Sequence, residues 1–543
     1  EDGIRDVERS RGLGDVYKRQ VMDTLSISRV AALDVNLPTK VVASMVAAAA
    51  PKELLALILP FASSMVWPDE APSRRRGAPA GSAPFGSNVW AVSPWRTADW
   101  LPLVATDPHV GLTAPCMWYA ACVRIDGGGR AVAGLTVPGW PFFVLGRNRH
   151  LAWGAANMLA ESCDLYREKI HGASYEVDAR TRTLTTRVET VPVRGERPHR
   201  AVIRHTHRGP VVSDSALLRA LLHLPAGADV SLAWPAAIAP TDELTAFRRI
   251  NRARNVREFA AALKTYGQCA LNFIAADSDG RIALTPAAAL PKRPRPPGGR
   301  ILDGTSTRDD WEGVTLPAPL ADCIDPPEGV LVNANDLPVP GGRDDVIGPL
   351  TCPPYRGDRL RELLTNDQRL TPRRAGQIQR DCFCKFTNEF TSLVRPLIPA
   401  PARAIHRQAF DLLRRFDGNM NAGSASAAVA GVLAELFRMK LFQHLLGKNV
   451  GPRFAHYYLS YPAVLRILRA EVSKHDVLRL ESPSDAGAGG ARLRSIAADA
   501  FTGAVRYLSR TQGRRPGLWR WGRVCLLYTS DAADELDGVD LGG

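Results

Sequence analysis

The sequence predicts an α+β fold in which antiparallel sheets stack on each other and helices cover them on the outside. Three observations carry this prediction. Short apolar runs separated by Gly, Pro and Asp dominate residues 88–205 and are typical of strands. One amphipathic helix is expected at 242–266. From Asp358 onward the pattern is mostly helical, so the strands largely precede the helices instead of alternating with them.

The expected elements follow in chain order. Residues 21–61 are predicted helical, and 68–84, rich in Pro, Ala, Gly, Ser and Arg, is predicted to be an exposed linker. Strands are expected at 88–92, 102–106, 130–136, 142–145, 189–193 and 201–205. A further strand pair, 271–276 and 281–284, flanks a turn. Helices are expected at 358–364, 372–388, 402–416, 424–446 and 461–474.

The helix at 242–266 has the most specific pattern. Asp242 is placed to cap its start, and a one-sided apolar stripe runs along it. The residues of that stripe are Leu244, Phe247, Ile250, Phe259 and Leu263. A stripe of this kind indicates a helix packed on one side against a sheet.

Composition excludes several classes of protein. The net charge is +14, which admits a nucleic-acid partner, but no RNP motif, zinc-finger spacing or long basic helix accompanies it. We therefore expect no nucleic-acid binding. No run of 18 apolar residues predicts a membrane span. The nine cysteines are irregularly spaced and match neither a zinc site nor a small disulfide framework.

Ser87 is the candidate nucleophile. Serine needs a base to become nucleophilic, and no G-x-S-x-G elbow is present. Cleavage between Gly86 and Ser87 would release an α-amine with a pKa of about 8, which can accept the hydroxyl proton directly or through one water. Gly86 leaves the carbonyl of that bond accessible. A Gly-Ser pair alone is weak, since the sequence also contains Gly81-Ser82.

The context of Ser87 carries more weight. The motifs in order are Gly86-Ser87-Asn88-Val89-Trp90, Asp107-Pro108-His109-Val110-Gly111-Leu112, Gly134-x-x-x-Pro138-Gly139, Gly146-x-Asn148 and Ala152-Trp153-Gly154. This run, from Gly86 to Arg293, resembles the penicillin acylase family of N-terminal-nucleophile hydrolases, which includes acyl-homoserine-lactone acylases. The resemblance implies a four-layer αββα sandwich with additional helices. It also implies self-cleavage at Gly86–Ser87 and no cofactor for catalysis.

The resemblance assigns roles to four further residues. The oxyanion hole is expected from the side-chain amide of Asn272 and the backbone N–H of Asn157. Arg293 is expected to orient the site and stabilise charge near the nucleophile. His109 stands 22 residues after Ser87, where penicillin G acylases carry Gln but cephalosporin acylases and acyl-homoserine-lactone acylases carry His, and it is expected to tune the pKa of the α-amine. The alternatives are a turn or strand-edge amide for Asn272, a solvated arginine for Arg293 and a core histidine for His109.

Two further sites come from the same resemblance. Val110 and Leu145 fall where benzyl-preferring members carry Phe, which favours a roomier pocket for an aliphatic acyl group. Glu161, Cys163 and Asp164 lie where members bind a structural calcium, with Cys163 offering its carbonyl oxygen. The alternative is an acidic surface turn.

The two ends have a foreign composition. Residues 1–20 and 524–543 resemble translated sequencing-adapter DNA; natural disordered tails are the alternative. By the resemblance, 21–67 is a remnant of the small chain, 68–86 a linker or propeptide, and 87–523 the catalytic chain, truncated at its C-terminus. We expect a fragment truncated at both ends of a periplasmic or secreted bacterial protein.

The predicted function is a self-processing hydrolase of linear amides with an apolar acyl group. Its substrates would be acylated amines such as β-lactam side chains or N-acyl homoserine lactones. Its small and catalytic chains would remain together as a heterodimer. The alternatives are a catalytically inactive binding relative of the same fold and a basic nucleic-acid-binding protein.

Overall fold

The computed structural model describes residues 39–60, 86–472 and 488–528, apart from short internal gaps. These gaps are 111–115, 126–129, 222–223, 225–226, 236–237, 239–240, 338–343 and the single residues 268, 297, 319 and 368. The predicted linker 68–84 and the segment 1–20 lie outside the described residues.

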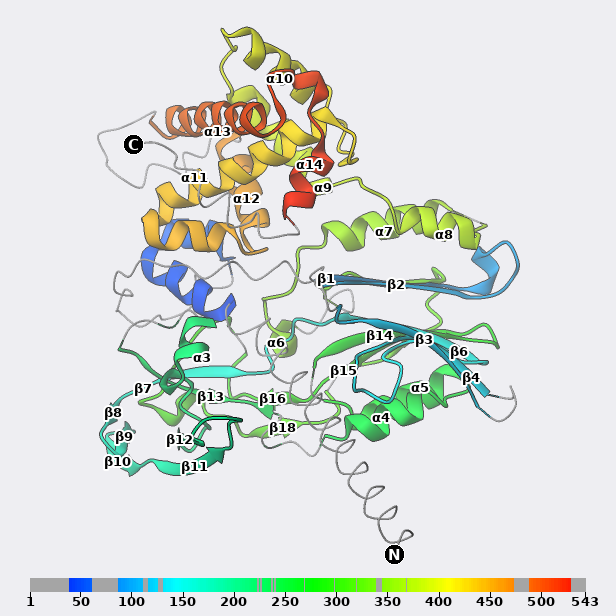
Figure 1. The fold of residues 1–543 in the computed structure, drawn as a ribbon, viewed down its shortest axis with the longest axis vertical. Helices are drawn as coiled ribbons and strands as arrows, with labels where there is room; N and C mark the ends of the chain where they lie inside the picture. Colours follow the sequence, from blue (N-terminus) through cyan, green and yellow to red (C-terminus); the bar gives the residue numbers. More distant parts are fainter. Residues whose placement is uncertain are drawn as a thin grey trace, which may run out of the picture.

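Two sheets face each other at the centre of the molecule (Figure 1). The smaller has the order β2-β1-β20, formed by β1 (Gly86–Val92), β2 (Leu103–His109) and β20 (Val330–Asn333). The larger has the order β19-β15-β14-β6-β5-β4-β3. Its strands are β3 (Tyr119–Ile125), β4 (Arg130–Thr136), β5 (Leu145–Arg147), β6 (Leu151–Asn157), β14 (Leu271–Asp277), β15 (Ile282–Ala287) and β19 (Cys323–Ile324).

Successive side chains of β1 point to opposite faces of the smaller sheet and so pack against different layers. Val89 and Ala91 pack inward, in one buried cluster with Ile274 of β14, so they fill the space between the two sheets. Trp90 and Val92 belong to a different cluster, shared with the helices α7 (Tyr355–Asn366) and α8 (Pro372–Ile378). These two helices therefore cover the outer face of the smaller sheet.

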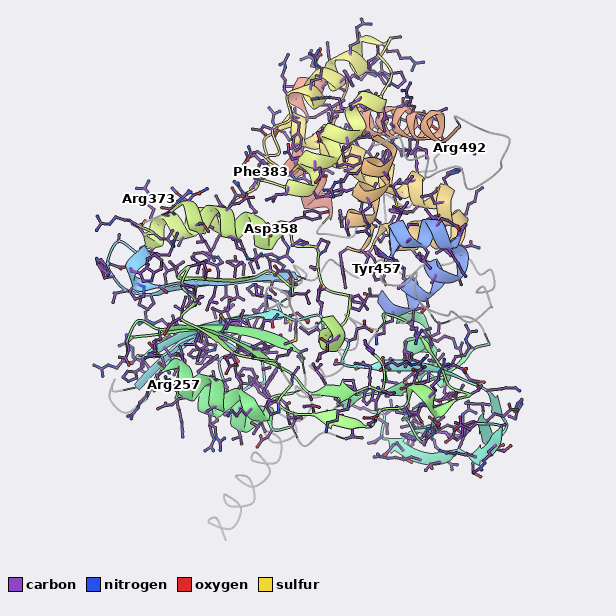
Figure 2. The ribbon with its side chains drawn as sticks, turned by 180° about the vertical axis from the view of Figure 1, so that it is seen from behind. Arg257, Asp358, Arg373, Phe383, Tyr457 and Arg492 are labelled. Carbon is purple, nitrogen blue, oxygen red and sulfur yellow. The ribbon has the colours of Figure 1, made fainter. Side chains whose placement is uncertain are left out.

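The outer face of the larger sheet is covered by α4 (Glu243–Ile250) and α5 (Val256–Ala262). Phe247 and Phe259 from these helices meet Phe273 of β14 edge-on, with ring centroids 6.4 and 6.0 Å apart. The central body thus has four layers, helix, sheet, sheet and helix. Arg257 marks one outer layer, and Asp358 and Arg373 mark the other (Figure 2).

The prediction of a single helix at 242–266 is wrong in one respect, because the helix is interrupted between α4 and α5. Asn251 lies at the end of α4, where its side chain binds the backbone of Phe143 at both N–H and C=O, 2.9 Å each. Asn255 then caps a new helix by accepting from the N–H of Glu258 at 2.9 Å. Asp242 caps α4 as predicted, at 2.9 Å from the N–H of Thr245.

A helical lobe stands beside the sandwich (Figure 1). Its helices are α9 (Lys385–Val394), α10 (Ala404–Arg414), α11 (Ala425–Ala455), α12 (Ser460–Val472), α13 (Ala488–Gln512) and α14 (Trp521–Tyr528). The helix predicted at 372–388 is two helices, α8 and α9, and α13 was missed. Helical residues 39–49 and α2 (Lys52–Ile58) pack into the same hydrophobic cluster as these helices.

The remaining strands form small sheets beside the sandwich, below the helical lobe in Figure 1. They are β7 (Asp164–Glu168), β13 (Asp229–Ala233) and β17 (Leu302–Asp303); β8 (Ile170–His171), β9 (Ser174–Val177) and β10 (Arg180–Thr183); β11 (Thr185–Val191) and β12 (His199–His205); and β16 (Leu290–Lys292) and β18 (Gly313–Thr315). Two short helices, α3 (Ala216–Leu221) and α6 (Asp344–Ile347), complete the structure. The predicted strand 142–145 is mostly loop, since β5 begins only at Leu145. Within the described ranges, no helix is long and apolar enough to cross a membrane.

Candidate active site

Ser87 is the second residue of β1, and alternation places its side chain on the same inner face as Val89. Its hydroxyl donates to the carbonyl oxygen of Gly86 at 2.7 Å. Its N–H donates to Oδ1 of Asn335 at 2.6 Å. The peptide bond expected to be cut is therefore held by protein contacts on both of its sides.

Asn335 was not predicted from the sequence. It follows β20 in a tight turn, with a positive φ of 66°. Asp336 holds the turn by accepting from the N–H of Ala334 at 2.8 Å, and Asn333 donates to the carbonyl of Asp336 at 3.0 Å. The one local signal is the run Asn333-Ala334-Asn335-Asp336, because Asn tolerates positive φ better than most residues. That signal indicates a turn but does not reveal its neighbour.

Arg356, in the first turn of α7, is the second residue that the sequence did not indicate. Its Nη1 donates to the carbonyl of Ser87 at 2.8 Å and to Oδ1 of Asn88 at 2.7 Å. Its Nη2 donates to the carbonyl of Ala334 and to Oδ1 of Asn335, both at 2.8 Å. The planar guanidinium thereby fixes the start of β1 against the turn that carries Asn335.

Asn157 is brought next to this group by Asn335. Nδ2 of Asn335 donates to the carbonyl of Asn157 at 2.7 Å, so one amide side chain joins Ser87 to the end of β6. The predicted role of the Asn157 N–H as an oxyanion donor stays a prediction.

Asn272 lies on β14, where alternation with Ile274 places its side chain on the inner face between the sheets. Its side chain is fully buried. Neither its Oδ1 nor its Nδ2 has a hydrogen-bond partner among the described residues. Leaving such a group unpaired costs about 1–3 kcal/mol, so it needs an explanation. Its predicted role in the oxyanion hole gives one, and stays a prediction.

His109 pairs with Gly86 across the β1–β2 ladder. A Cβ added at Gly86 would lie 3.3 Å from Nδ1 of His109 and 3.2 Å from Nη2 of Arg356. Loss of hydration and the charge of Arg356 lower the pKa of His109 to about 4, although its side chain keeps an exposed surface. The imidazole is therefore neutral near pH 7 and lies beside the carbonyl side of the bond.

The two predicted pocket residues lie apart. Leu145 is buried in the cluster with Phe247 and Phe259, between the larger sheet and helices α4 and α5. Val110 follows the end of β2 and is half-buried. No contact joins Leu145 to Ser87 among the described interactions, and the pocket role of both residues stays a prediction.

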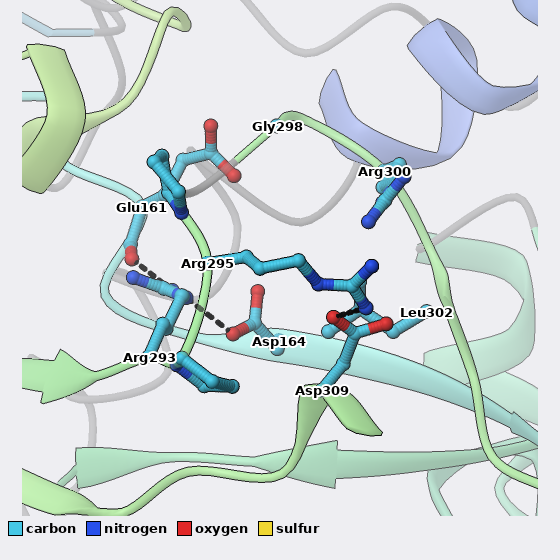
Figure 3. A pocket seen from close by; sticks show the side chains of 10 residues that line it. Glu161, Asp164, Arg293, Arg295, Gly298, Arg300, Leu302 and Asp309 are labelled. Atoms are coloured by element: carbon cyan, nitrogen blue, oxygen red, sulfur yellow. Dashed lines mark hydrogen bonds and ion pairs between the residues drawn. The ribbon is translucent and has the colours of Figure 1, made fainter. Parts of the chain in front are cut away.

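Arg293 lies in a different cluster, with Glu161 and Asp164 (Figure 3). Its Nε donates to Oδ2 of Asp164 at 2.7 Å, and its Nη2 donates to the carbonyl of Glu161. The arginine that the structure places against Ser87 is Arg356. The described contacts of Arg293 are with Asp164 and Glu161 and not with Ser87. Its predicted role at the nucleophile stays a prediction.

The three predicted calcium ligands do converge, but on a lysine. Nζ of Lys40 lies 2.6 Å from the carbonyl oxygen of Cys163, 2.6 Å from Oδ1 of Asp164 and 2.9 Å from Oε2 of Glu161. With the ammonium there, these residues do not fit a calcium ion. In the described ranges, no group of three or more His, Cys, Asp or Glu is arranged to hold a metal ion.

Burial alone would raise the pKa of the Asp164 carboxyl. The charges of Arg293 and Lys40, together with their hydrogen bonds, outweigh burial and hold this pKa at about 2. The carboxylate is therefore ionised throughout the physiological range.

Known proteins are similar to this chain in sequence and in architecture. A family model described as penicillin amidase matches residues 14–537. Acyl-homoserine lactone acylase QuiP from Pseudomonas fluorescens (strain Pf0-1) is 29% identical over 458 residues, which cover 81% of this chain and 54% of that protein. Penicillin acylase 2 proenzyme from Pseudomonas sp. (strain SE83) is 29% identical over 366 residues, 65% of this chain and 44% of that protein.

The chain spans about half the length of the curated relatives it matches. Among solved structures, the thermostable penicillin G acylase from Alcaligenes faecalis aligns with a TM-score of 0.60 and 21% identity, covering 80% of each chain. At that identity the likeness shows the fold alone.

Proposed function

The chain belongs to the penicillin amidase family, and from that premise we propose that it is a self-processing hydrolase of linear amides. The observation that carries the proposal is the set of contacts that the protein makes with Ser87. A serine at the start of an inner strand has its N–H bound by Asn335 and its carbonyl bound by Arg356, and the glycine before it pairs with His109 across the β1–β2 ladder. Two relatives have names that describe acylases, one of them a proenzyme.

The proposed first step is cleavage of the uncut chain. Ser87 Oγ attacks the carbonyl carbon of Gly86, the C–N bond breaks, and the nitrogen leaves as an amine that takes up a proton. The ester that forms between Gly86 and the Ser87 oxygen is then hydrolysed by water. Asn335 and Arg356 support this step by fixing the Ser87 peptide, which keeps the reacting atoms close.

The released α-amine then serves as the base for catalysis. It takes the proton of the Ser87 hydroxyl, which attacks the carbonyl carbon of an acylated amine. The amine product leaves with a proton, and water hydrolyses the acyl ester. The N–H of Asn157 and a side-chain amide would stabilise the oxyanion. Asn272 is the side-chain candidate because its amide has unused donors, whereas Asn335 contacts Ser87 through its acceptor oxygen Oδ1.

The proposed substrates are amides with an apolar acyl group, either N-acyl homoserine lactones or β-lactams with acyl side chains. Relatives named for both classes have the same identity to this chain, 29%, so similarity alone does not favour one over the other.

The experiment follows the chain on a denaturing gel and sequences the new N-terminus. Wild type is expected to give two pieces, the larger beginning Ser-Asn-Val-Trp, and Ser87→Ala a single piece. Ser82→Ala removes the other nearby Gly-Ser serine and serves as the matched control that still cuts. Processed protein is then assayed with long-chain acyl homoserine lactones and with penicillin G. A cut elsewhere, or a cut in Ser87→Ala, would contradict the proposal.

A further inference from the structure

One buried lysine connects the N-terminal segment to the sheet region. Lys40 lies in the helical residues 39–49, and its side chain has no solvent exposure. Its ammonium contacts three oxygen atoms, one from each of Glu161, Cys163 and Asp164. An ammonium has three N–H donors, so each has one oxygen to bind.

The oxygen atoms form a cage suited to a cation. Two carboxylates and a backbone carbonyl from one short turn are the oxygen ligands that hard cations prefer. Nζ of Lys40 lies 2.6 Å from Oδ1 of Asp164 and 2.9 Å from Oε2 of Glu161, so the lysine forms an ion pair with each carboxylate.

The rest of the cage is also occupied by the chain itself. Oδ2 of Asp164 accepts from Nε of Arg293 and from Nε1 of Trp311, both at 2.7 Å. Both carboxylate oxygens of Glu161 accept from the N–H of Gly299 at 3.0 Å. Two positive and two negative side chains therefore balance, and every carboxylate oxygen has a partner. Lys40 and these other donors therefore already bind the oxygens that a metal ion would need.

We propose that Lys40 is the resident cation of this cage, taking the place of a divalent metal and tying the N-terminal segment to the sheet region. The tie extends along the segment: the N–H of Ile301 donates to Oγ of Ser44 at 3.0 Å, and Nη2 of Arg466 donates to the carbonyl of Ile58 at 2.9 Å. Lys40 precedes Gly86 and its partners follow Ser87. If the chain is cut as proposed above, the tie holds two chains together, and that part rests on the proposed function.

The first test uses uncut Ser87→Ala protein, so it does not depend on cleavage. Thermal melting is measured in EDTA, in calcium chloride and in sodium chloride of equal ionic strength. We expect the melting temperature of the Lys40-containing protein to be the same in all three. Lys40→Ala should melt about 5 °C or more lower in EDTA, because it leaves buried charges without their partner. Calcium should restore at least half of that loss, since it can enter the emptied cage.

Lys52→Ala, which removes an exposed lysine from the same segment, is the matched control and should not respond to calcium. Two outcomes would overturn the proposal: a Lys40-containing protein that calcium stabilises, or Lys40→Ala protein that is not destabilised or that calcium does not restore. If Lys40→Ala does not fold, Lys40→Met/Glu161→Gln removes one charge of each sign. The double variant should have a higher melting temperature than Lys40→Met alone. An equal or lower melting temperature would overturn the proposal.

The second test uses processed protein. Lys40→Met should release the small piece from the large one on gel filtration in EDTA, whereas wild type and Lys52→Ala should elute as one complex. If the two pieces of Lys40→Met still elute as one complex, Lys40 does not hold the two chains together and the proposal is overturned. A protein that never cuts would instead count against the proposed function and leave the melting result standing.

Discussion

Removing the Asn335 side chain tests the proposed site most directly. The change is Asn335→Gly, because glycine adopts the observed φ of 66° without strain, whereas alanine would not. The substitution deletes three contacts: the acceptor for the Ser87 N–H at 2.6 Å, the acceptor for Nη2 of Arg356 at 2.8 Å and the donor to the Asn157 carbonyl at 2.7 Å.

The size of the effect follows from those contacts. Each hydrogen bond contributes about 1 kcal/mol net, so the free energy of unfolding should fall by about 3 kcal/mol. The effect on rate is separate. Misplacing the reacting groups by about 1 Å can lower a rate by roughly 10²-fold. We therefore expect self-cleavage to slow by that factor, followed as the uncut fraction over time on denaturing gels. Stability is measured by urea unfolding in a Ser87→Ala background, where cleavage does not interfere.

Asn272→Ala is the paired variant. Its amide has no hydrogen-bond partner among the described residues, so the rate of self-cleavage and the free energy of unfolding should change little. The turnover of an acyl substrate should fall by roughly 10²–10³. The reasoning about Asn335 is refuted if Asn335→Gly cuts at the wild-type rate while remaining folded. Near-normal turnover of Asn272→Ala would remove Asn272 from the mechanism.

Three more predictions concern residues around Ser87. Gly86→Val should slow cleavage at least tenfold, because even a Cβ would lie 3.2 Å from Arg356 and a larger side chain would push the bond out of place; unchanged cutting on gels would contradict this. Arg356→Lys should slow cleavage by a similar factor while the protein stays folded by circular dichroism, since a lysine cannot bind four acceptors in a fixed plane; wild-type cutting would argue against it. His109→Gln concerns acid stability. The folded pKa of His109 is about 4, below the unfolded value of about 6.5, so the unfolded state binds the proton first and stability falls as pH drops from 6.5 to 4. Solvent at the exposed ring keeps this effect below about 1 kcal/mol, and the variant should show a flatter melting profile over that range; an identical slope would contradict the assignment.

The sequence by itself singled out Ser87 as the candidate nucleophile and predicted much of its framework. Strands such as β1 and β14 follow from alternation and flanking turn residues, which act over a few neighbouring positions. The Asp242 cap is equally local. The context of Ser87 was also enough to indicate the family, because its motifs keep their spacing along one stretch of chain.

Contacts between distant segments were decided only by the tertiary structure. Asn335 and Arg356 reach Ser87 from 248 and 269 residues away, and the local pattern around Asn335 indicates a turn without showing what that turn contacts. The break in the helix predicted at 242–266 depends on Asn251 binding the backbone of Phe143, 108 residues earlier. Lys40 fills the predicted calcium cage from 123 residues before Cys163. Local propensity is a property of neighbouring residues, whereas the partner of a charged or amide side chain depends on which elements pack together.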